Sequence, residues 1–187
     1  MDNTADHDEC MSALADAGIY LVLDVNTPKY SLNRAGKPLA VPSSPCRPTD
    51  TIVADPSTSY NDVYLQNIFA TADKFANYDN TLAYFSGNEV INDGPTSKAA
   101  PYVKAVTRDL RQYIRNRGHR HIPVGYSAAD IDTNRLQMAE YMNCGTEDER
   151  SDFFAFNDYS WCDPSSFQIS GWDQKVKNFT GYGLPLL

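Results

Sequence analysis

The chain has 187 residues, a net charge of −8 and an apolar fraction of 42%. This length suits one ordinary domain but is short of the roughly 250 residues of a complete eight-stranded barrel. The acidic balance argues against a nucleic-acid partner, because the phosphate backbone is bound by clustered Lys and Arg. No apolar run reaches the length of about 18 residues that a transmembrane segment requires.

Strands and helices alternate along the predicted chain. Apolar runs predict strands at residues 19–24, 82–86, 122–126 and 153–156. Apolar residues spaced three and four apart, together with capping residues, predict helices that begin at residue 4 or 6 and end near 16, and at 60–78, 101–116, 134–143 and 172–179. Residues 181–187 begin a further apolar element. This alternation predicts βα units, a parallel sheet and the α/β class.

Each predicted strand is followed by polar or acidic residues. Asp24 ends the first strand, and a break at Gly87 follows the second and presents Asn88 and Glu89. In α/β proteins catalytic groups lie where strands end, so these side chains indicate a site on one rim and favour a barrel over a doubly wound sheet. The alternative for the Asn-Glu pair is a strand-end cap that binds loop amides.

Other enzyme classes lack their motifs. No G-x-G-x-x-G or Walker sequence is present, which argues against a nucleotide site. The serine of residues 125–129 lacks the second glycine of a hydrolase elbow. The four cysteines show no C-x-x-C spacing and no nearby histidine pair, so we expect no metal and no cofactor. From spacing alone, disulfides and free thiols both remain open.

Residues 36–54 interrupt the pattern. This segment, GKPLAVPSSPCRPTDTIVA, contains four prolines, one cysteine and no helical or strand period. We expect an irregular insert in an otherwise single domain spanning 1–187. One hypothesis is a retained intron, since nineteen codons keep the reading frame and Gly-Lys can be encoded by a splice-donor sequence.

Several longer strings resemble a known family. LVLDVNTPKYSLNR, YNDVYLQNIFAT, LAYFSGNEVINDGP, IPVGYSAAD and NDYSWC, in this order, are similar to the catalytic domain of fungal β-1,3-glucanosyltransferases, the Gas/Gel/Phr-type members of glycoside hydrolase family seventy-two. The resemblance covers nearly the whole chain except residues 36–54. It implies a (β/α)8 TIM barrel, of which this chain would be an incomplete part, about strands three to six and the start of seven.

The resemblance also implies a reaction. Such enzymes cleave β-1,3-glucan chains of the cell wall internally and join the new end to another glucan. They are secreted glycoproteins, usually held at the cell surface by a glycolipid (GPI) anchor, whereas the polar N-terminus of this chain does not resemble a signal peptide and no anchor signal is seen. The expected partners are therefore glucan donor and acceptor chains.

Site residues follow from the matched motifs. A retaining glycosidase uses two carboxyl groups about 5 to 5.5 Å apart. By resemblance Glu89 is the acid/base, Asn88 binds the sugar 2-hydroxyl, and Tyr159 lies beside the nucleophile and the same sugar. The nucleophile is expected on the seventh strand, beyond Leu187. Polar residues matched to the substrate groove are Asp24, Asp130 and Arg135.

Two further expectations depend on this assignment. Without the nucleophile, the isolated chain could be an inactive fragment or a glucan-binding remnant instead of an active transferase; a plain hydrolase is a third interpretation. Asn178, in Asn-Phe-Thr, is an N-glycosylation acceptor if the chain is secreted. Cys10, Cys144 and Cys162 match family disulfide cysteines whose partners lie outside this chain, while Cys46 belongs to the insert.

Overall fold

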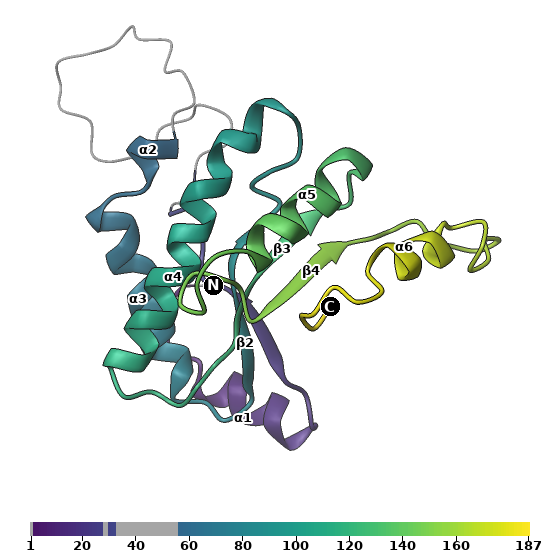
Figure 1. Ribbon diagram of the computed structural model, residues 1–187. Helices are drawn as coiled ribbons and strands as arrows, with labels where there is room; N and C mark the ends of the chain where they lie inside the picture. The colour runs from purple at the N-terminus through teal and green to yellow at the C-terminus, as the bar shows by residue number, and fades with distance from the viewer. Residues whose placement is uncertain (1, 28–29, 33–55) are drawn as a thin grey trace, which may run out of the picture.

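A parallel sheet forms the centre of the protein in the computed structural model, which describes residues 2–27, 30–32 and 56–187. In this part of the chain the sheet has four strands in the order β1-β2-β3-β4, and every neighbouring pair is parallel (Figure 1). The strands are β1 (Leu21–Asp24), β2 (Thr81–Asn88), β3 (Val124–Ala129) and β4 (Phe153–Asn157). The α/β class and the parallel sheet are thus confirmed.

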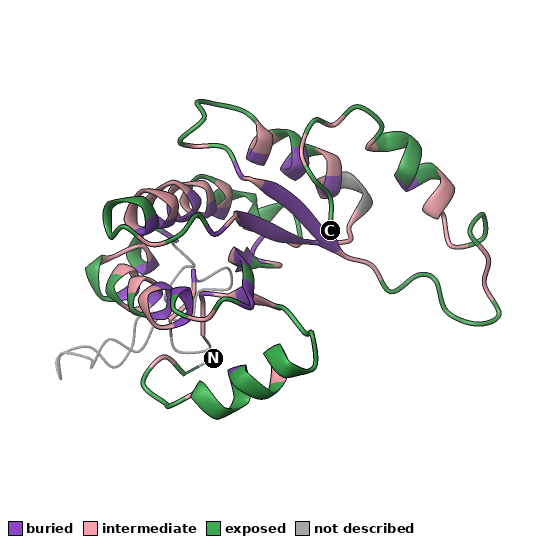
Figure 2. Cartoon of the chain, turned by 90° about the horizontal axis from the view of Figure 1, so that it is seen from below, coloured by how far each residue is buried: buried purple, intermediate pink, exposed green. Residues whose placement is uncertain are grey.

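The helices are α1 (Asp8–Asp16), α2 (Pro56–Ser59), α3 (Asp62–Ala76), α4 (Ala100–Asn116), α5 (Asp132–Asn143) and α6 (Trp172–Asn178), with a 3-10 turn, η1 (Pro95–Ala99), before α4. Helices α2 to α5 connect successive strands, while α1 precedes β1 and α6 follows β4. Helix α3 packs on α4, α4 packs on β2 and β3, and α5 packs on β3 and β4. In Figure 2 strands β3 and β4 are almost wholly buried, whereas the outer faces of the helices are exposed.

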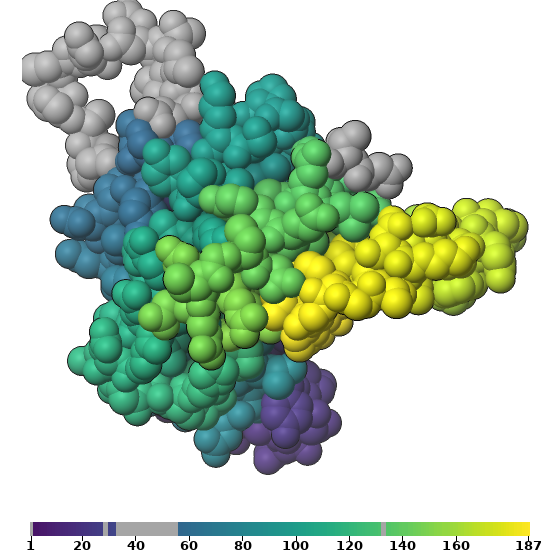
Figure 3. Space-filling view, in the orientation of Figure 1, coloured from purple at the N-terminus to yellow at the C-terminus, as the bar shows by residue number. Residues whose placement is uncertain are grey.

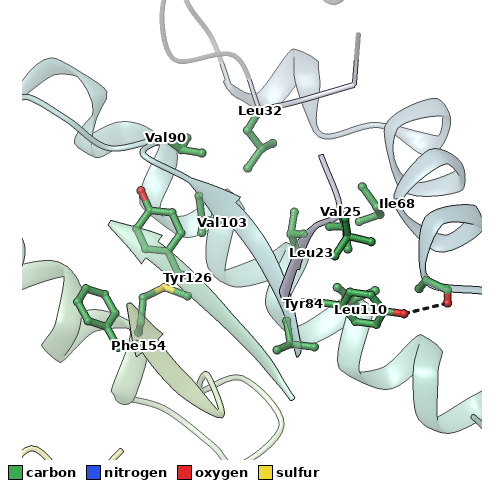
Figure 4. Packing of buried hydrophobic residues seen from close by; sticks show 14 of the residues in the cluster. Leu23, Val25, Leu32, Ile68, Tyr84, Val90, Val103, Leu110, Tyr126 and Phe154 are labelled. Atoms are coloured by element: carbon green, nitrogen blue, oxygen red, sulfur yellow. Dashed lines mark hydrogen bonds between the residues drawn. The ribbon is translucent and has the colours of Figure 1, made fainter. Parts of the chain in front are cut away.

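Alternation along the strands creates two apolar layers. Tyr84, Tyr126 and Phe154 belong to the large cluster that includes the helices, as Figure 4 shows. The Tyr84 hydroxyl, buried in this layer, donates to the Ala72 carbonyl of α3 at 3.1 Å. A smaller cluster on alternate residues contains Ala83, Phe153 and Ala155, with Val22 and Phe85 packed against it.

Gly125 allows β3 and β4 to lie close together. A Cβ atom at this position would lie 2.5 Å from the Phe153 carbonyl oxygen and 2.6 Å from its ring. A side chain there would force the two strands apart. The glycine is therefore required by strand packing and not by a turn, because its backbone lies in β3.

Several predicted strand boundaries are wrong. The break expected at Gly87 does not end β2: the register with β3 shifts between Phe85 and Asn88, but β2 continues to Asn88, which pairs with Ser127 of β3. Strand β3 begins at Val124 and not at residue 122, since the preceding Pro123 has no amide to donate, and β3 then runs three residues further, to Ala129. Pairing between strands thus extends β2 and β3 into the polar residues that follow their apolar runs.

The helix boundaries also differ slightly. Asn61 caps α3, which begins at Asp62 and not at residue 60, and its side chain accepts from the Tyr64 amide at 3.0 Å. Helix α1 begins at Asp8 without a side-chain cap bond. Met11 is its buried residue, whereas Cys10 is exposed. Cys144 and Cys162 are exposed thiols as well.

The C-terminal segment leaves the sheet and returns to it. In Figure 3 its atoms extend beyond the body of the molecule. Leu186 then forms a parallel bridge with Phe154, and the Leu187 amide donates to the Phe154 carbonyl at 2.9 Å. The further apolar element expected at residues 181–187 therefore lies along β4.

Two remaining points concern segments and membranes. Residues 36–54, with Cys46, lie outside the described residues, so the structure does not bear on the retained-intron hypothesis. In the part that the structure describes, no helix combines the length and apolarity needed to span a membrane.

Candidate functional site

Three strand ends meet through one asparagine. Asn157, the last residue of β4, donates from Nδ2 to Asn88 Oδ1 at 2.9 Å and to Glu89 Oε1 at 2.8 Å. Its Oδ1 accepts from the Ser127 hydroxyl at 2.9 Å. The carboxyl ends of β2, β3 and β4 therefore share one hydrogen-bond network. This network fixes the direction of the Glu89 carboxylate.

The backbone at Glu89 is strained. Its φ is +48°, and among the described residues other than glycine it is the single position with a positive φ. This left-handed conformation is uncommon for a residue with a side chain and concentrates at functional sites. The Glu89 amide donates to the Ser127 carbonyl at 2.8 Å, and the next two residues, Val90 and Ile91, are buried. The backbone hydrogen bond of Glu89 and the two buried residues after it thus hold this strained conformation in place.

Asp24 lies at the end of β1 in a second hydrogen-bond group. Its Oδ1 accepts from the Asn26 amide at 2.9 Å and from Asn26 Nδ2 at 2.7 Å. Asn26 also donates to the Ser86 carbonyl of β2 at 3.1 Å and accepts from the Tyr64 hydroxyl at 2.6 Å. Burial raises the pKa of Asp24, although the bonds from Asn26 act in the opposite direction.

Asp130 and Arg135 belong to a buried charge cluster. The guanidinium of Arg135, on α5, pairs with Asp130 Oδ1 at the end of β3. Lys175 Nζ, from α6, lies 2.9 Å from Asp130 Oδ2 and also pairs with Asp158 just after β4. Arg135 is 5% exposed and Lys175 is 7% exposed. The four charges thus join α5 and α6 to the ends of two strands.

The pKa values in this cluster favour the charged forms. Burial alone would raise the pKa of Asp158, but bonds from Lys175 and Ser160 outweigh it and lower that pKa. Burial likewise opposes the charged Lys175, yet its bonds to Asp158 and Asp130 raise its pKa. Lys175 and Asp158 are therefore held as ions.

The predicted site residues are not all in one contact group. Asn88 and Glu89 are joined through Asn157, and Asp130 is joined to Arg135. Tyr159 is 82% exposed, in the segment after β4. Asn178 is exposed at the end of α6.

Sequence reasoning missed two central side chains. Asn157 stands out in the sequence only as part of a polar strand end. Its side chain reaches residues 88 and 89 across the end of β3, because parallel strands in this order end at the same edge of the sheet. Lys175 gives no signal, because a lysine on a short amphipathic helix is normally exposed. Its burial arises from tertiary packing.

Comparison with known proteins is consistent with this arrangement. A family model described as glucanosyltransferase matches residues 1–42 and 46–187, so the match extends into the 36–54 segment from both sides. The 1,3-beta-glucanosyltransferase gel1 of Aspergillus fumigatus is 76% identical over 186 residues, covering 100% of this chain and 37% of the relative. The 1,3-beta-glucanosyltransferase GAS5 of Saccharomyces cerevisiae is 51% identical over 187 residues, covering 100% of this chain and 35% of the relative.

A solved structure agrees with these sequence matches. Gas2p of Saccharomyces cerevisiae in complex with laminaritriose and laminaritetraose aligns with a TM-score of 0.85 and 35% identity, covering 100% of this chain and 38% of that chain. The chain thus spans little more than a third of the length of the relatives it matches. From the family match and these identities, the chain belongs to the glucanosyltransferases of glycoside hydrolase family seventy-two.

Proposed function

We propose that the protein carrying this chain is a 1,3-β-glucanosyltransferase in which Glu89 is the acid/base. The single observation that carries the proposal is the Asn157 amide, which binds both Asn88 and Glu89 at the carboxyl edge of a parallel sheet. Catalytic groups of such sheets lie at this edge. The names of the relatives, and the laminaritriose and laminaritetraose in the complex of Gas2p, support the substrate class.

The proposed chemistry has two steps. Glu89 first protonates the oxygen of the leaving glucan while a second carboxylate attacks the anomeric carbon, and a glycosyl-enzyme forms. Glu89 then deprotonates the hydroxyl of the acceptor glucan, which attacks the same carbon and releases the second carboxylate. Asn88 binds the 2-hydroxyl, a contact that strengthens in the oxocarbenium-like transition state. The second carboxylate is the glutamate that the resemblance expects on the strand after Gly-Leu-Pro.

We also propose that the sheet is part of a (β/α)8 barrel. Leu186 bridges to Phe154 in the parallel sense, as the next barrel strand would. The apolar face formed by Ala83, Phe153 and Ala155 would then point into the barrel. Asp24, Asp130, Arg135 and Tyr159 would line the groove at its carboxyl end.

The extracellular setting is a further proposal. Asn178 is exposed and lies in an Asn-Phe-Thr sequence, which suits N-glycosylation in a secreted, surface-anchored glycoprotein. Deglycosylation of the protein purified from its native host should lower its mass, and Asn178→Gln should reduce that change by one glycan. An unchanged mass of the native protein after deglycosylation would contradict modification at this position.

The decisive experiment replaces Glu89 in the full-length protein. Glu89→Gln keeps the shape and the acceptor for Asn157 but cannot transfer a proton, so elongation of reduced laminari-oligosaccharides should fall about a thousandfold. Its thermal unfolding should match that of the unchanged protein. Glu140→Gln, an exposed glutamate of α5, is the matched control and should retain elongation.

Each alternative has its own outcome. Oligosaccharide binding without products from the unchanged protein would favour a glucan-binding remnant, and shortened products without elongated ones would favour a hydrolase. Full elongation by Glu89→Gln would refute the assignment of the acid/base.

A further inference from the structure

Lys175 is buried in a way that lysines rarely are. Its side chain is 9% exposed, and lysines are almost never fully buried unless they are paired. Its ammonium group contacts Asp130, Asp158 and Ser160, the last at 3.3 Å. The ring centroids of Trp172 and Phe156 lie 5.6 and 6.0 Å from the same nitrogen. The charge is therefore enclosed by two acids and two aromatic rings.

The cluster is balanced in charge. Arg135 and Lys175 supply two cations, and Asp130 and Asp158 supply two carboxylates, with Asp130 shared between both cations. Removing one member of a buried ion group leaves an uncompensated charge, which is strongly unfavourable. Without Lys175, Asp130 would keep its pair with Arg135, whereas Asp158 would lose its ion pair and keep the hydrogen bond from the Ser160 amide. Asp130 and Asp158, no longer bridged by the ammonium group, would then repel each other and move apart.

Both carboxylates lie beside predicted groove residues. Asp130 is itself a predicted substrate contact, and Asp158 immediately precedes Tyr159. The Ser160 amide donates to Asp158 Oδ1 at 2.7 Å, so the position of Asp158 also sets the backbone on the other side of Tyr159. A cavity of about 870 Å³ adjoins the cluster and is lined by Asp130, Ser160 and Lys175, among others. A displacement of Lys175 would thus move both Asp130 and the segment around Tyr159, which are predicted to line the groove.

We propose that Lys175 is a positioning residue that holds Asp130 and the Tyr159 segment in the geometry that binds glucan, without contacting the reacting atoms itself. This role rests on the proposed function. In this role α6 serves to place one buried ammonium group at the ends of β3 and β4, which the sequence alone does not indicate. The competing interpretation is that Lys175 only stabilises the fold.

The test separates binding from stability. Lys175→Met keeps the length and apolar stem of the side chain and removes the charge, whereas Lys175→Arg keeps the charge. In a Glu89→Gln background, which prevents turnover, calorimetric titration with laminaritetraose should show about tenfold weaker binding for Lys175→Met, as expected for a displaced positioning contact. Lys175→Arg should recover binding to within about threefold. In the active protein the KM should rise while kcat changes less.

A neighbouring lysine provides the control. Lys177 is on the same helix, has a side chain 68% exposed and lies 3.5 Å from Asp173. Lys177→Met should leave binding unchanged. Adding Asp158→Asn to Lys175→Met restores the charge balance and should regain part of the lost affinity, which an apolar packing defect would not.

The outcomes distinguish the two claims. If the unchanged protein neither binds nor elongates glucan, the proposed function fails, and the positioning role fails with it. If the unchanged protein binds and elongates, but Lys175→Met shows the same KM and a kcat reduced only by its unfolded fraction, the positioning role alone is refuted. Weaker binding by a fully folded Lys175→Met, recovered by arginine, supports it.

Discussion

Asn157→Ala tests whether one amide orients the proposed catalytic pair. The substitution removes the donors to Asn88 Oδ1 and Glu89 Oε1 and the acceptor for the Ser127 hydroxyl. The backbone pairing of β4 with β3 stays in place, because it uses main-chain groups. The change is therefore local to the network that joins the three strand ends.

The expected loss of stability is modest. A hydrogen bond contributes about 1 kcal/mol between neutral groups and about 2 kcal/mol to a carboxylate, so the three bonds of Asn157 set an upper limit of about 4 kcal/mol. Asn88 is exposed and Asn157 half-buried, so water replaces much of this. The free energy of unfolding should fall by about 1 to 2 kcal/mol, or about 3 to 6 °C in Tm.

Activity should fall much further than stability. A carboxylate free to leave its productive direction loses the advantage of orientation, and we expect kcat/KM for transfer between laminari-oligosaccharides to fall about a hundredfold. Urea unfolding and transfer kinetics on the same preparations give both quantities. Ser127→Ala is the matched control, since it removes one bond of Asn157 but leaves the donors to Asn88 and Glu89, and should keep activity within about fivefold. An Asn157→Ala protein of reduced stability but full activity would refute the reasoning.

Two further predictions concern the supporting structure. Gly125→Ala places a Cβ 2.5 Å from the Phe153 carbonyl oxygen, so overpacking should lower the free energy of unfolding by about 3 kcal/mol, and a change below about 0.5 kcal/mol in urea unfolding would contradict the strand spacing. Asp73 accepts hydrogen bonds from His119 (2.6 Å) and Tyr113 (2.7 Å); burial raises its pKa, but these bonds and Arg117 outweigh burial and lower it. Because the folded pKa is lowered, the resulting stability is complete above the ordinary value of about 4 and is lost as the pH falls through the folded value. Asp73→Asn should therefore cost about 1 kcal/mol at pH near 6 and progressively less below pH about 4, by urea unfolding; a pH-independent cost would contradict the pairing.

The sequence was sufficient for the order of the sheet because its signals are local. Apolar runs separated by amphipathic helices require parallel strands, and polar residues after each run mark the carboxyl edge. The residue at which β2 ends could not be predicted from the neighbouring sequence. Gly87 indicates a break by its own preference, and the register of β2 with β3 does shift between Phe85 and Asn88, yet the pairing of Asn88 with Ser127 continues the strand past the glycine. Tertiary hydrogen bonds thus overrode a local signal.

Asn157 and Lys175, the side chains that organise the site, could not be predicted from the neighbouring sequence either, because their partners are distant in the chain. Glu89 can be found from its place after a strand, but the partner that orients it lies 68 positions away on β4. Lys175 has an ordinary helical setting in the sequence, and its role depends on Asp130, 45 positions earlier. Such pairs become visible only when the strand order is known and the ends are brought together.

The choice of an amide beside Glu89 has a chemical reason. A lysine or arginine at position 157 could hold the carboxylate in place, but its positive charge would favour the ionised form and oppose the protonated acid needed for the first step. A carboxylate there would repel the ionised base needed for the second step. The neutral Asn157 amide orients Glu89 without a net charge of its own. The charged cluster of Lys175 can use full ion pairs because none of its members has to transfer a proton in the proposed reaction.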